Sequence, residues 1–101
     1  MAAEVVYLPS AGADLASIYD WLSDLSDPGH AFAYVDRIQT ACEGLAGLPG
    51  RGTPHDDLEP GLRSIPFERR ATIYYRVAED RVEIVRILHA GRDAEREFGA
   101  S

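Results

Sequence analysis

The sequence predicts an α+β fold, β-α-α-β-β-β-(α), in which a helix hairpin packs on a small, mainly antiparallel sheet. Three observations lead to this prediction. Two amphipathic helical patterns fill residues 10–48, the hydrophobic period switches to two after residue 61, and the chain is 101 residues long. Helical and strand patterns that occupy separate halves are typical of a two-layer α+β sandwich. The length suits a single domain, residues 1–101, with a buried core.

A short strand and a helix open the chain. Residues 4–8 are β-prone and end at Pro9. Ser10 is expected to cap the helix that follows, and Asp14 lies near its first turn, where a carboxylate suits the helix dipole. The apolar stripe of this helix comprises Leu15, Ile18, Tyr19, Leu22 and Leu25.

A second helix follows a short break. Asp27 as N-cap and Pro28 as the first helical residue predict its start. Two amphipathic helices joined by so short a turn are expected to pack as a hairpin. Cys42 lies on the apolar stripe and is interpreted as a small hydrophobic residue rather than a nucleophile. The stripe is expected to comprise Phe32, Val35, Ile38, Cys42 and Leu45, with Leu48 at its far end.

The second half reads as a loop and three strands. Residues 49–61 are punctuated by proline and glycine, which predicts the loop. A strand is expected at residues 62–67, and residues 71–77 alternate as a two-faced strand does. Residues 82–89 are apolar on both faces, which predicts a central strand. A short helix over residues 94–98 ends the pattern.

Charge and composition exclude several function classes. The chain has 10 basic residues, all arginine, against 17 acidic ones, for a formal charge of −7. Direct nucleic-acid binding is not expected of so acidic a chain. No apolar run is long enough for a membrane helix and no signal peptide is visible, so we expect a cytoplasmic location. One cysteine and three scattered histidines offer no metal-ligand spacing, and no cofactor motif is present.

Residues of two kinds are candidates for binding a partner. Arginines on the predicted strands and the last turn should converge if the strands pair as a meander, either as a patch for an acidic partner, which we favour, or as a solvated, ion-paired face. Aromatic side chains beside the helical stripes or on the last helix are either core rim or partner anchors. The candidates are Arg63, Arg76, Arg86, Arg92, Trp21, Tyr34 and Phe98.

Several short motifs occur in a characteristic order along nearly the whole chain. They include Ala13-Asp14-Leu15, Pro60-Gly61-Leu62-Arg63, Tyr74-Tyr75-Arg76-Val77, Ile84-Val85-Arg86-Ile87-Leu88-His89 and Gly91-Arg92-Asp93. In this order the set resembles the ParE branch of the RelE/ParE toxin superfamily of bacterial type II toxin–antitoxin systems. The resemblance implies a toxin that binds DNA gyrase. It also implies a hetero-oligomer with a ParD-like ribbon-helix-helix antitoxin, which neutralises the toxin.

The RelE branch of that superfamily implies a different activity, the cleavage of mRNA on the ribosome. Such a nuclease has an arginine on the middle strand and a tyrosine near the C-terminus, where this chain has Thr72 and Phe98. A phenylalanine has no hydroxyl to transfer a proton. The chain is therefore expected not to be an enzyme. Two alternatives remain: a nuclease rearranged around His89, Arg92 and Arg63, or an inactive member that only binds its antitoxin.

Overall fold

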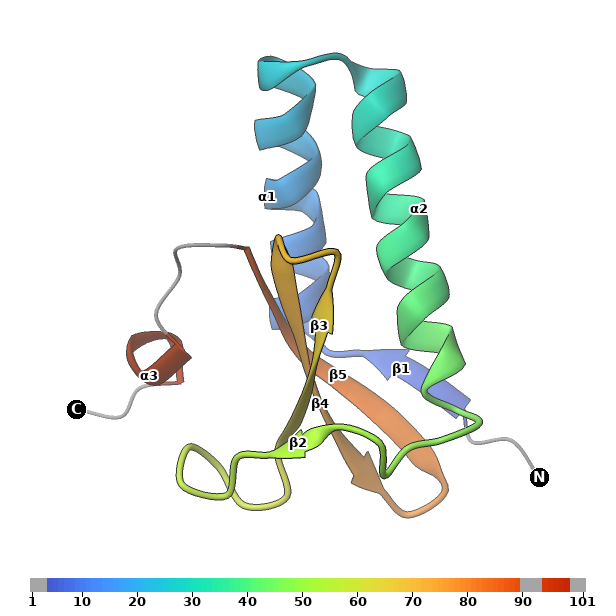
Figure 1. The fold of residues 1–101 in the computed structure, drawn as a ribbon, viewed down its shortest axis with the longest axis vertical. Helices are drawn as coiled ribbons and strands as arrows, with labels where there is room; N and C mark the ends of the chain where they lie inside the picture. Colours follow the sequence, from blue (N-terminus) through green and yellow to red (C-terminus); the bar gives the residue numbers. More distant parts are fainter. Residues whose placement is uncertain (1–3, 90–93, 99–101) are drawn as a thin grey trace.

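The computed structural model describes residues 4–89 and 94–98, and it has the predicted order of elements (Figure 1). One element was not predicted, a two-residue strand inside the expected loop. The elements are β1 (Glu4–Tyr7), α1 (Pro9–Leu25), α2 (Pro28–Gly44), β2 (Thr53–Pro54), β3 (Arg63–Phe67), β4 (Ala71–Ala78), β5 (Arg81–His89) and α3 (Ala94–Glu97).

The strands form one sheet in the order β1-β5-β4-β3-β2. Short turns join β3 to β4 and β4 to β5, so these strands pair antiparallel, whereas β1 pairs parallel with β5 after the chain has passed through both helices. The prediction of a central last strand is confirmed in the sense that β5 lies inside the sheet and not at its edge, because it has a hydrogen-bonded neighbour on each side. The apolar character of both faces of β5 follows from this position.

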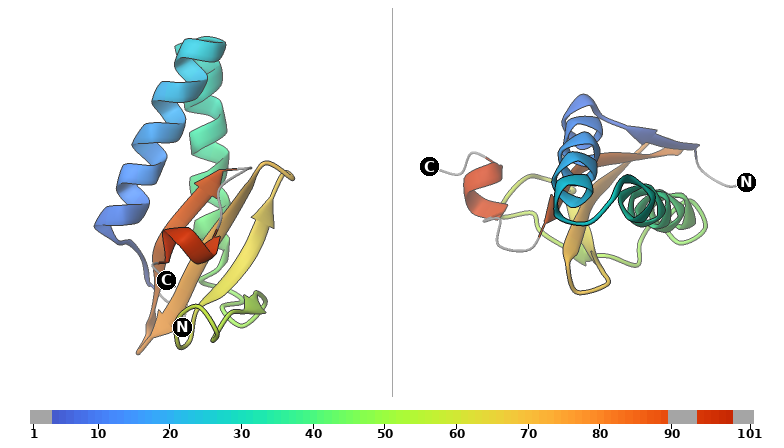
Figure 2. Two further views of the ribbon diagram at one scale, coloured as in Figure 1. Left: turned by 90° about the vertical axis from the view of Figure 1, so that its left-hand side faces the viewer. Right: turned by 90° about the horizontal axis from the view of Figure 1, so that it is seen from above.

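Each face of the sheet has its own apolar cluster. Alternation along β4 turns Ile73 and Tyr75 toward α1 and α2, and Tyr74 toward the opposite side. Figure 2 shows α2 and α3 on opposite sides of the sheet. A bulge in β5 leaves Val85 without a cross-strand partner, because Tyr74 pairs with Arg86 and Tyr75 with Ile84. Val85 therefore joins Tyr74 in the cluster on the α3 side.

The predicted helical stripes are wrong at their outer ends. Leu25 is 68% exposed and Phe32 is 67% exposed, whereas Tyr34, expected beside the stripe, is 2% exposed. The reason is visible in Figure 1, where the loop between α1 and α2 projects beyond the end of the sheet. Apolar residues near that loop have no sheet to pack against. Leu48, beyond the end of α2, is likewise exposed.

The two helix starts differ from each other. Asp27 caps α2 as predicted, because its side chain accepts a hydrogen bond from the His30 amide at 2.9 Å. The prediction for Ser10 is wrong, since α1 begins at Pro9 and Ser10 is already helical. The Ser10 hydroxyl instead donates to the carbonyl of Val85 at 2.7 Å, which fastens the start of α1 to the bulge of β5.

Candidate functional site

Arg63 holds a loop against the sheet. It pairs across the β3–β4 ladder with Tyr75, and cross-strand partners share a face, so its side chain lies on the side that the helices cover. Its guanidinium donates to the carbonyls of Gly50 at 3.2 Å and Gly52 at 2.7 Å. The Tyr75 hydroxyl donates to the Pro49 carbonyl at 2.8 Å and accepts from the Gly52 amide at 2.9 Å. Two buried or half-buried side chains thus satisfy the backbone of this loop.

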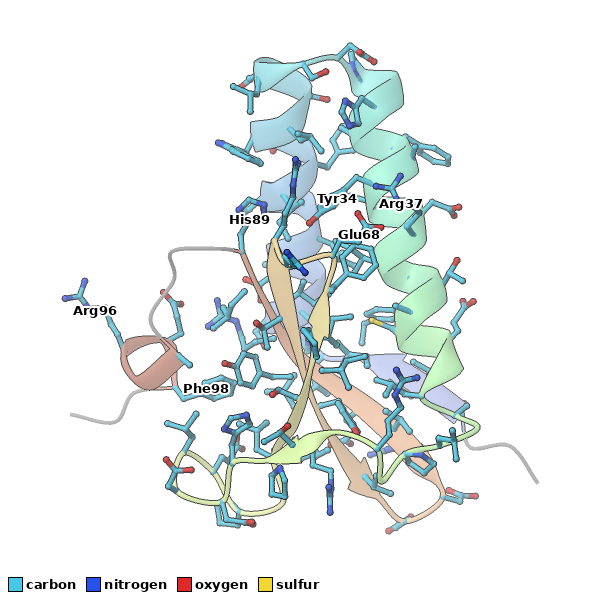
Figure 3. The ribbon with its side chains drawn as sticks, in the orientation of Figure 1. Tyr34, Arg37, Glu68, His89, Arg96 and Phe98 are labelled. Atoms are coloured by element: carbon cyan, nitrogen blue, oxygen red, sulfur yellow. The ribbon has the colours of Figure 1, made fainter. Side chains whose placement is uncertain are left out.

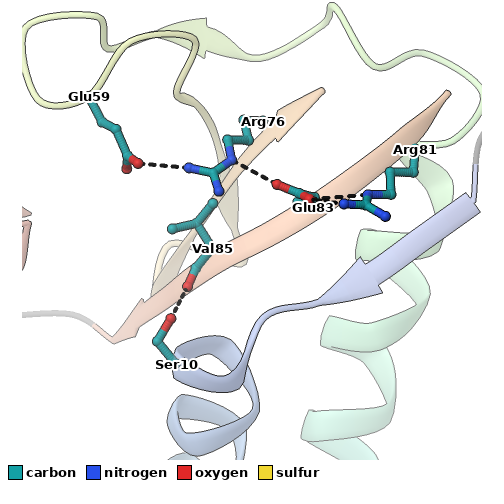
Figure 4. A network of polar contacts seen from close by, with 6 residues as sticks. All are labelled: Ser10, Glu59, Arg76, Arg81, Glu83 and Val85. Atoms are coloured by element: carbon teal, nitrogen blue, oxygen red, sulfur yellow. Dashed lines mark hydrogen bonds and ion pairs between the residues drawn. The ribbon is translucent and has the colours of Figure 1, made fainter. Parts of the chain in front are cut away.

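Arg76 belongs to an ion-pair network on the opposite face (Figure 4). Its guanidinium bonds Glu83 at 2.8 Å and Glu59 at 2.7 Å, and Arg81 bonds the second oxygen of Glu83 at 2.8 Å. The hydrogen bond from Arg76, followed by that from Arg81, lowers the pKa of the Glu83 carboxyl. Two arginines and two carboxylates make this network neutral overall.

Arg86 joins three elements through its guanidinium. Asp14 of α1 accepts two hydrogen bonds from it, and Glu97 of α3 lies 3.0 Å away. Asp14 also accepts the Ile87 amide at 2.9 Å. The hydrogen bonds that Arg86 donates to Asp14 raise the pKa of Arg86 above its ordinary value. Asp14 was expected to interact with the dipole of α1, but its carboxylate accepts hydrogen bonds from Arg86 and Ile87 of β5.

The predicted convergence of four arginines on one open patch is wrong. Arg63 lies on the helix-covered face because it pairs with Tyr75, while Arg76 and Arg86 pair with Glu83 and Tyr74 on the other face. Each of these three guanidinium groups also has acceptors within the chain. Arg92, the fourth, lies outside the described residues.

The candidate aromatic anchors differ in accessibility. Trp21 is 47% exposed, and its ring lies 4.6 Å from that of His89. Phe98 packs edge-on against Tyr74, with 5.0 Å between ring centroids, and caps the apolar cluster on the α3 side. The ring of Tyr34 is buried, so it is a core residue and not an accessible anchor.

The residues of the alternative nuclease set are not brought together where the structure describes them. His89 pairs with Ala71, which also pairs with Phe67, four residues along β3 from Arg63. Four residues of strand span about 13 Å. His89 is the last residue of β5, and its ring packs beside that of Trp21. Thr72 pairs with Leu88 on the α3 side, the face that also holds Phe98.

The structure assembles a cationic cluster that the sequence analysis missed. Glu68, Arg69 and Arg70 form the turn between β3 and β4, and Arg37 of α2 bonds Glu68. The signal was present as three consecutive charged residues between two predicted strands. The sequence does not show that α2 brings Arg37 to this turn.

Other functional chemistry finds little support in the described part of the chain. Burial raises the pKa of the Cys42 thiol to about 11, so the thiolate needed for nucleophilic attack is disfavoured. Among the described residues, histidines, cysteines and carboxylates do not gather into a group that could hold a metal ion. In the same residues, no helix has the length and apolar character needed to cross a bilayer.

Comparison with known sequences adds a family. Residues 5–94 match the family model described as "ParE toxin of type II toxin-antitoxin system, parDE". A protein named Toxin ParE1 from Mycobacterium tuberculosis is 31% identical over 97 residues, covering 95% of this chain and 98% of that protein. A Toxin ParE1 from Caulobacter vibrioides is 33% identical, covering 88% and 91%. A Toxin RelE2 from the same organism is 38% identical over 90 residues, covering 89% and 98%.

Comparison with solved structures agrees. A chain of the "Chromosomal ParDE TA system from P. aeruginosa" superposes with a TM-score of 0.76 at 27% identity, covering 86% of this chain and 95% of that chain. The predicted fold class is therefore confirmed: two helices pack on a mixed five-stranded sheet, as in that structure.

Proposed function

Since the chain belongs to the ParE toxin family of type II toxin–antitoxin systems, we propose that it acts in the cytoplasm by binding DNA gyrase. A ParD-like ribbon-helix-helix antitoxin would hold it silent in a hetero-oligomer. The observation that carries the proposal is the match to the ParE family over residues 5–94. The neighbouring ParDE structure supports the choice of antitoxin.

The proposed action is binding rather than catalysis. In the related nuclease branch, an arginine and a tyrosine occupy the positions of Thr72 and Phe98. Thr72 and Phe98 lie on the same face of the sheet, yet neither supplies a guanidinium or a phenolic hydroxyl. A rearranged nuclease would need His89 and Arg63 close together, but the two residues lie four residues apart along the strand direction. Phosphate stabilisation and proton transfer therefore lack their usual side chains.

A second candidate is ribosome-dependent cleavage of mRNA. It is favoured by the relative named Toxin RelE2, which is 38% identical to this chain. The two candidates differ in a measurable product, since one leaves mRNA intact and the other cuts it. A third possibility, an inactive member that only binds its antitoxin, would be harmless when produced alone.

Two of the candidate anchors remain proposals for the partner surface. Trp21 is half exposed on α1, and Phe98 lies over the sheet on the short helix α3. Aromatic side chains at such positions contribute much of the energy of protein interfaces. Substituting either with alanine is expected to weaken antitoxin binding more than it lowers stability.

The experiment that tests the proposal compares two targets with one preparation. Purified protein is added to gyrase with relaxed plasmid, and separately to a translation reaction in which mRNA ends are mapped. We expect loss of supercoiling with uncut mRNA. Codon-specific cuts in the mRNA would contradict gyrase binding and favour ribosome-dependent mRNA cleavage.

A further inference from the structure

The turn between β3 and β4 has an unusual backbone. The Arg70 amide bonds the Phe67 carbonyl at 3.0 Å, and the two central residues, Glu68 and Arg69, have φ values of 48° and 61°. Both lie in the left-handed region, as in a type I′ turn, where glycine and asparagine are preferred. Two long charged side chains occupy this conformation at a steric cost, which persists only when the surroundings enforce it.

The surroundings here come from α2. Arg37 bonds both oxygens of the Glu68 carboxylate, at 2.9 and 3.1 Å, and its guanidinium lies 5.5 Å from the centre of the Tyr34 ring. Tyr34 in turn meets Phe67 edge-on at 5.6 Å. Figure 3 shows Tyr34, Arg37 and Glu68 together beside the turn. The tip of the β3–β4 hairpin is thus held against α2.

The Arg37–Glu68 ion pair engages the only carboxylate of the turn. The Arg37 hydrogen bond lowers the pKa of Glu68, so Glu68 is charged and already engaged at neutral pH. Arg69 and Arg70 are exposed, and no carboxylate among the described residues forms an ion pair with either of them. We call Arg37, Glu68, Arg69 and Arg70 the cationic tip.

The cationic tip stands out against the rest of the chain. Three arginines and one carboxylate give the cationic tip a charge of +2. Since the whole chain has a formal charge of −7, the remaining residues together carry −9. The arginines on the strands are engaged with acceptors inside the chain, as described above. Positive charge without an ion-pair partner among the described residues therefore lies at the exposed β3–β4 turn.

We propose that the cationic tip binds a short acidic peptide segment of a partner protein, whose carboxylates pair with Arg69 and Arg70. Two consecutive exposed arginines suit carboxylates, because each guanidinium can bind a carboxylate with two parallel hydrogen bonds. The hydrogen-bonded turn places the backbone of both arginines at the tip before binding, so that only their side chains need to be ordered on association.

The charge distribution favours an acidic peptide over a nucleic acid. A duplex carries one charge per about 1.7 Å and would extend well past the tip, over residues that carry −9 in total. Screening at physiological salt reaches only about 8 Å. A short peptide with a few carboxylates is attracted by the tip without reaching the rest of the chain, whereas a long polyanion is also repelled by the acidic remainder of the chain.

The inference rests on the proposed function in one respect, that an antitoxin would supply the acidic segment. The test therefore uses a synthetic probe and needs neither gyrase nor antitoxin. An octapeptide with four glutamates is titrated into the isotopically labelled full chain at low ionic strength, and amide shifts are followed by NMR. The matched peptide with four glutamines and an eight-nucleotide oligothymidylate are titrated in parallel.

We expect the glutamate peptide to shift the amides of residues 67–71 saturably, and added salt to weaken it. Arg69→Gln with Arg70→Gln should weaken binding by about fivefold to tenfold, since each exposed pair contributes modestly. Arg51→Gln with Arg96→Gln removes two other exposed arginines and is the charge-matched control, expected within about twofold of the unaltered chain. Arg69→Lys with Arg70→Lys keeps both charges but removes the guanidinium forks, so it should bind more tightly than the double glutamine variant and more weakly than the unaltered chain.

Three results would overturn the inference. The first is the absence of a saturable shift with the glutamate peptide. The second is equal weakening in the two double glutamine variants, which would mean that only net charge matters. The third is oligothymidylate binding to the same amides at lower concentration, which would assign the tip to nucleic acid. A failure of gyrase inhibition would leave all three readouts unaffected.

Discussion

The Asp14 carboxylate and the Arg86 guanidinium, 72 positions apart in the sequence, form a two-point ion pair with distances of 2.7 and 2.9 Å. The same guanidinium lies 3.0 Å from Glu97. One side chain of the central strand therefore joins the first helix to the last. Both partners of the pair are mostly buried, so its loss has consequences that an exposed pair would not have.

Asp14→Asn should lower the free energy of unfolding by about 1–3 kcal/mol. The amide oxygen can still accept the Ile87 amide, but the charge of Arg86 loses its nearest counterpart. Urea unfolding at neutral pH measures the effect. Asp20→Asn, on the exposed side of α1, is the matched control and should stay within about 0.5 kcal/mol. Equal losses at both positions would contradict a specific role for the Asp14 pair.

Glu83→Gln should flatten the acid side of the stability profile. Bonds from Arg76 and Arg81 lower the pKa of Glu83 in the folded protein. Its stabilising contribution is then fully present above about pH 4.3, the ordinary glutamate value, and is lost as pH falls through the lower folded-state pKa. Unfolding free energies of the native chain and the variant should therefore differ at pH 7 and converge on acidification. A gap that stays constant down to pH 3 would refute this.

Two tyrosine substitutions should have different effects. The Tyr75 hydroxyl bonds the Pro49 carbonyl and the Gly52 amide, so Tyr75→Phe leaves two backbone groups unpaired and should cost about 1–3 kcal/mol. The Tyr34 hydroxyl is buried and has no hydrogen-bond partner among the described residues. Tyr34→Phe should therefore be neutral or stabilising. Thermal denaturation of the two variants makes the comparison, and a larger loss for Tyr34→Phe would contradict these roles of the two hydroxyls.

Two neighbouring glycines also predict different outcomes. A Cβ at Gly52 would lie 2.5 Å from the Tyr75 hydroxyl and 2.8 Å from the Ser64 carbonyl, so Gly52→Ala must displace the loop. We expect a loss of about 1–3 kcal/mol, as for overpacked cores. Gly50→Ala meets no atom within 4 Å and should change stability by less than about 0.5 kcal/mol. Similar midpoints in denaturant for the two variants would show that the loop is not held where described.

Much of the fold could be predicted from hydrophobic periodicity. Helix and strand patterns placed the elements and the central position of β5 correctly. Periodicity does not tell where the sheet ends, however, so it could not show that Phe32 lies beyond the sheet and Tyr34 within reach of Phe67. The two residues of β2 are too few for any pattern to be visible.

The site was harder to predict because it depends on register. The run Ile84-Val85-Arg86-Ile87-Leu88 is apolar on both faces, so nothing in it marks the bulge that places Val85 and Arg86 on one side. Nor does a sequence show that carboxylates as remote as Asp14 will neutralise particular arginines. The sequence shows that charged residues are concentrated at the β3–β4 turn, but not that Arg69 and Arg70 have no ion pair among the described residues.

We propose that this ParE-family chain acts by binding gyrase and not by cutting RNA. The most direct test is a titration of purified protein into a gyrase supercoiling reaction, with a parallel aliquot added to translating ribosomes and the mRNA ends mapped. We predict dose-dependent loss of supercoiling and intact mRNA. Undiminished supercoiling together with codon-specific mRNA cleavage would contradict gyrase binding as the mode of action.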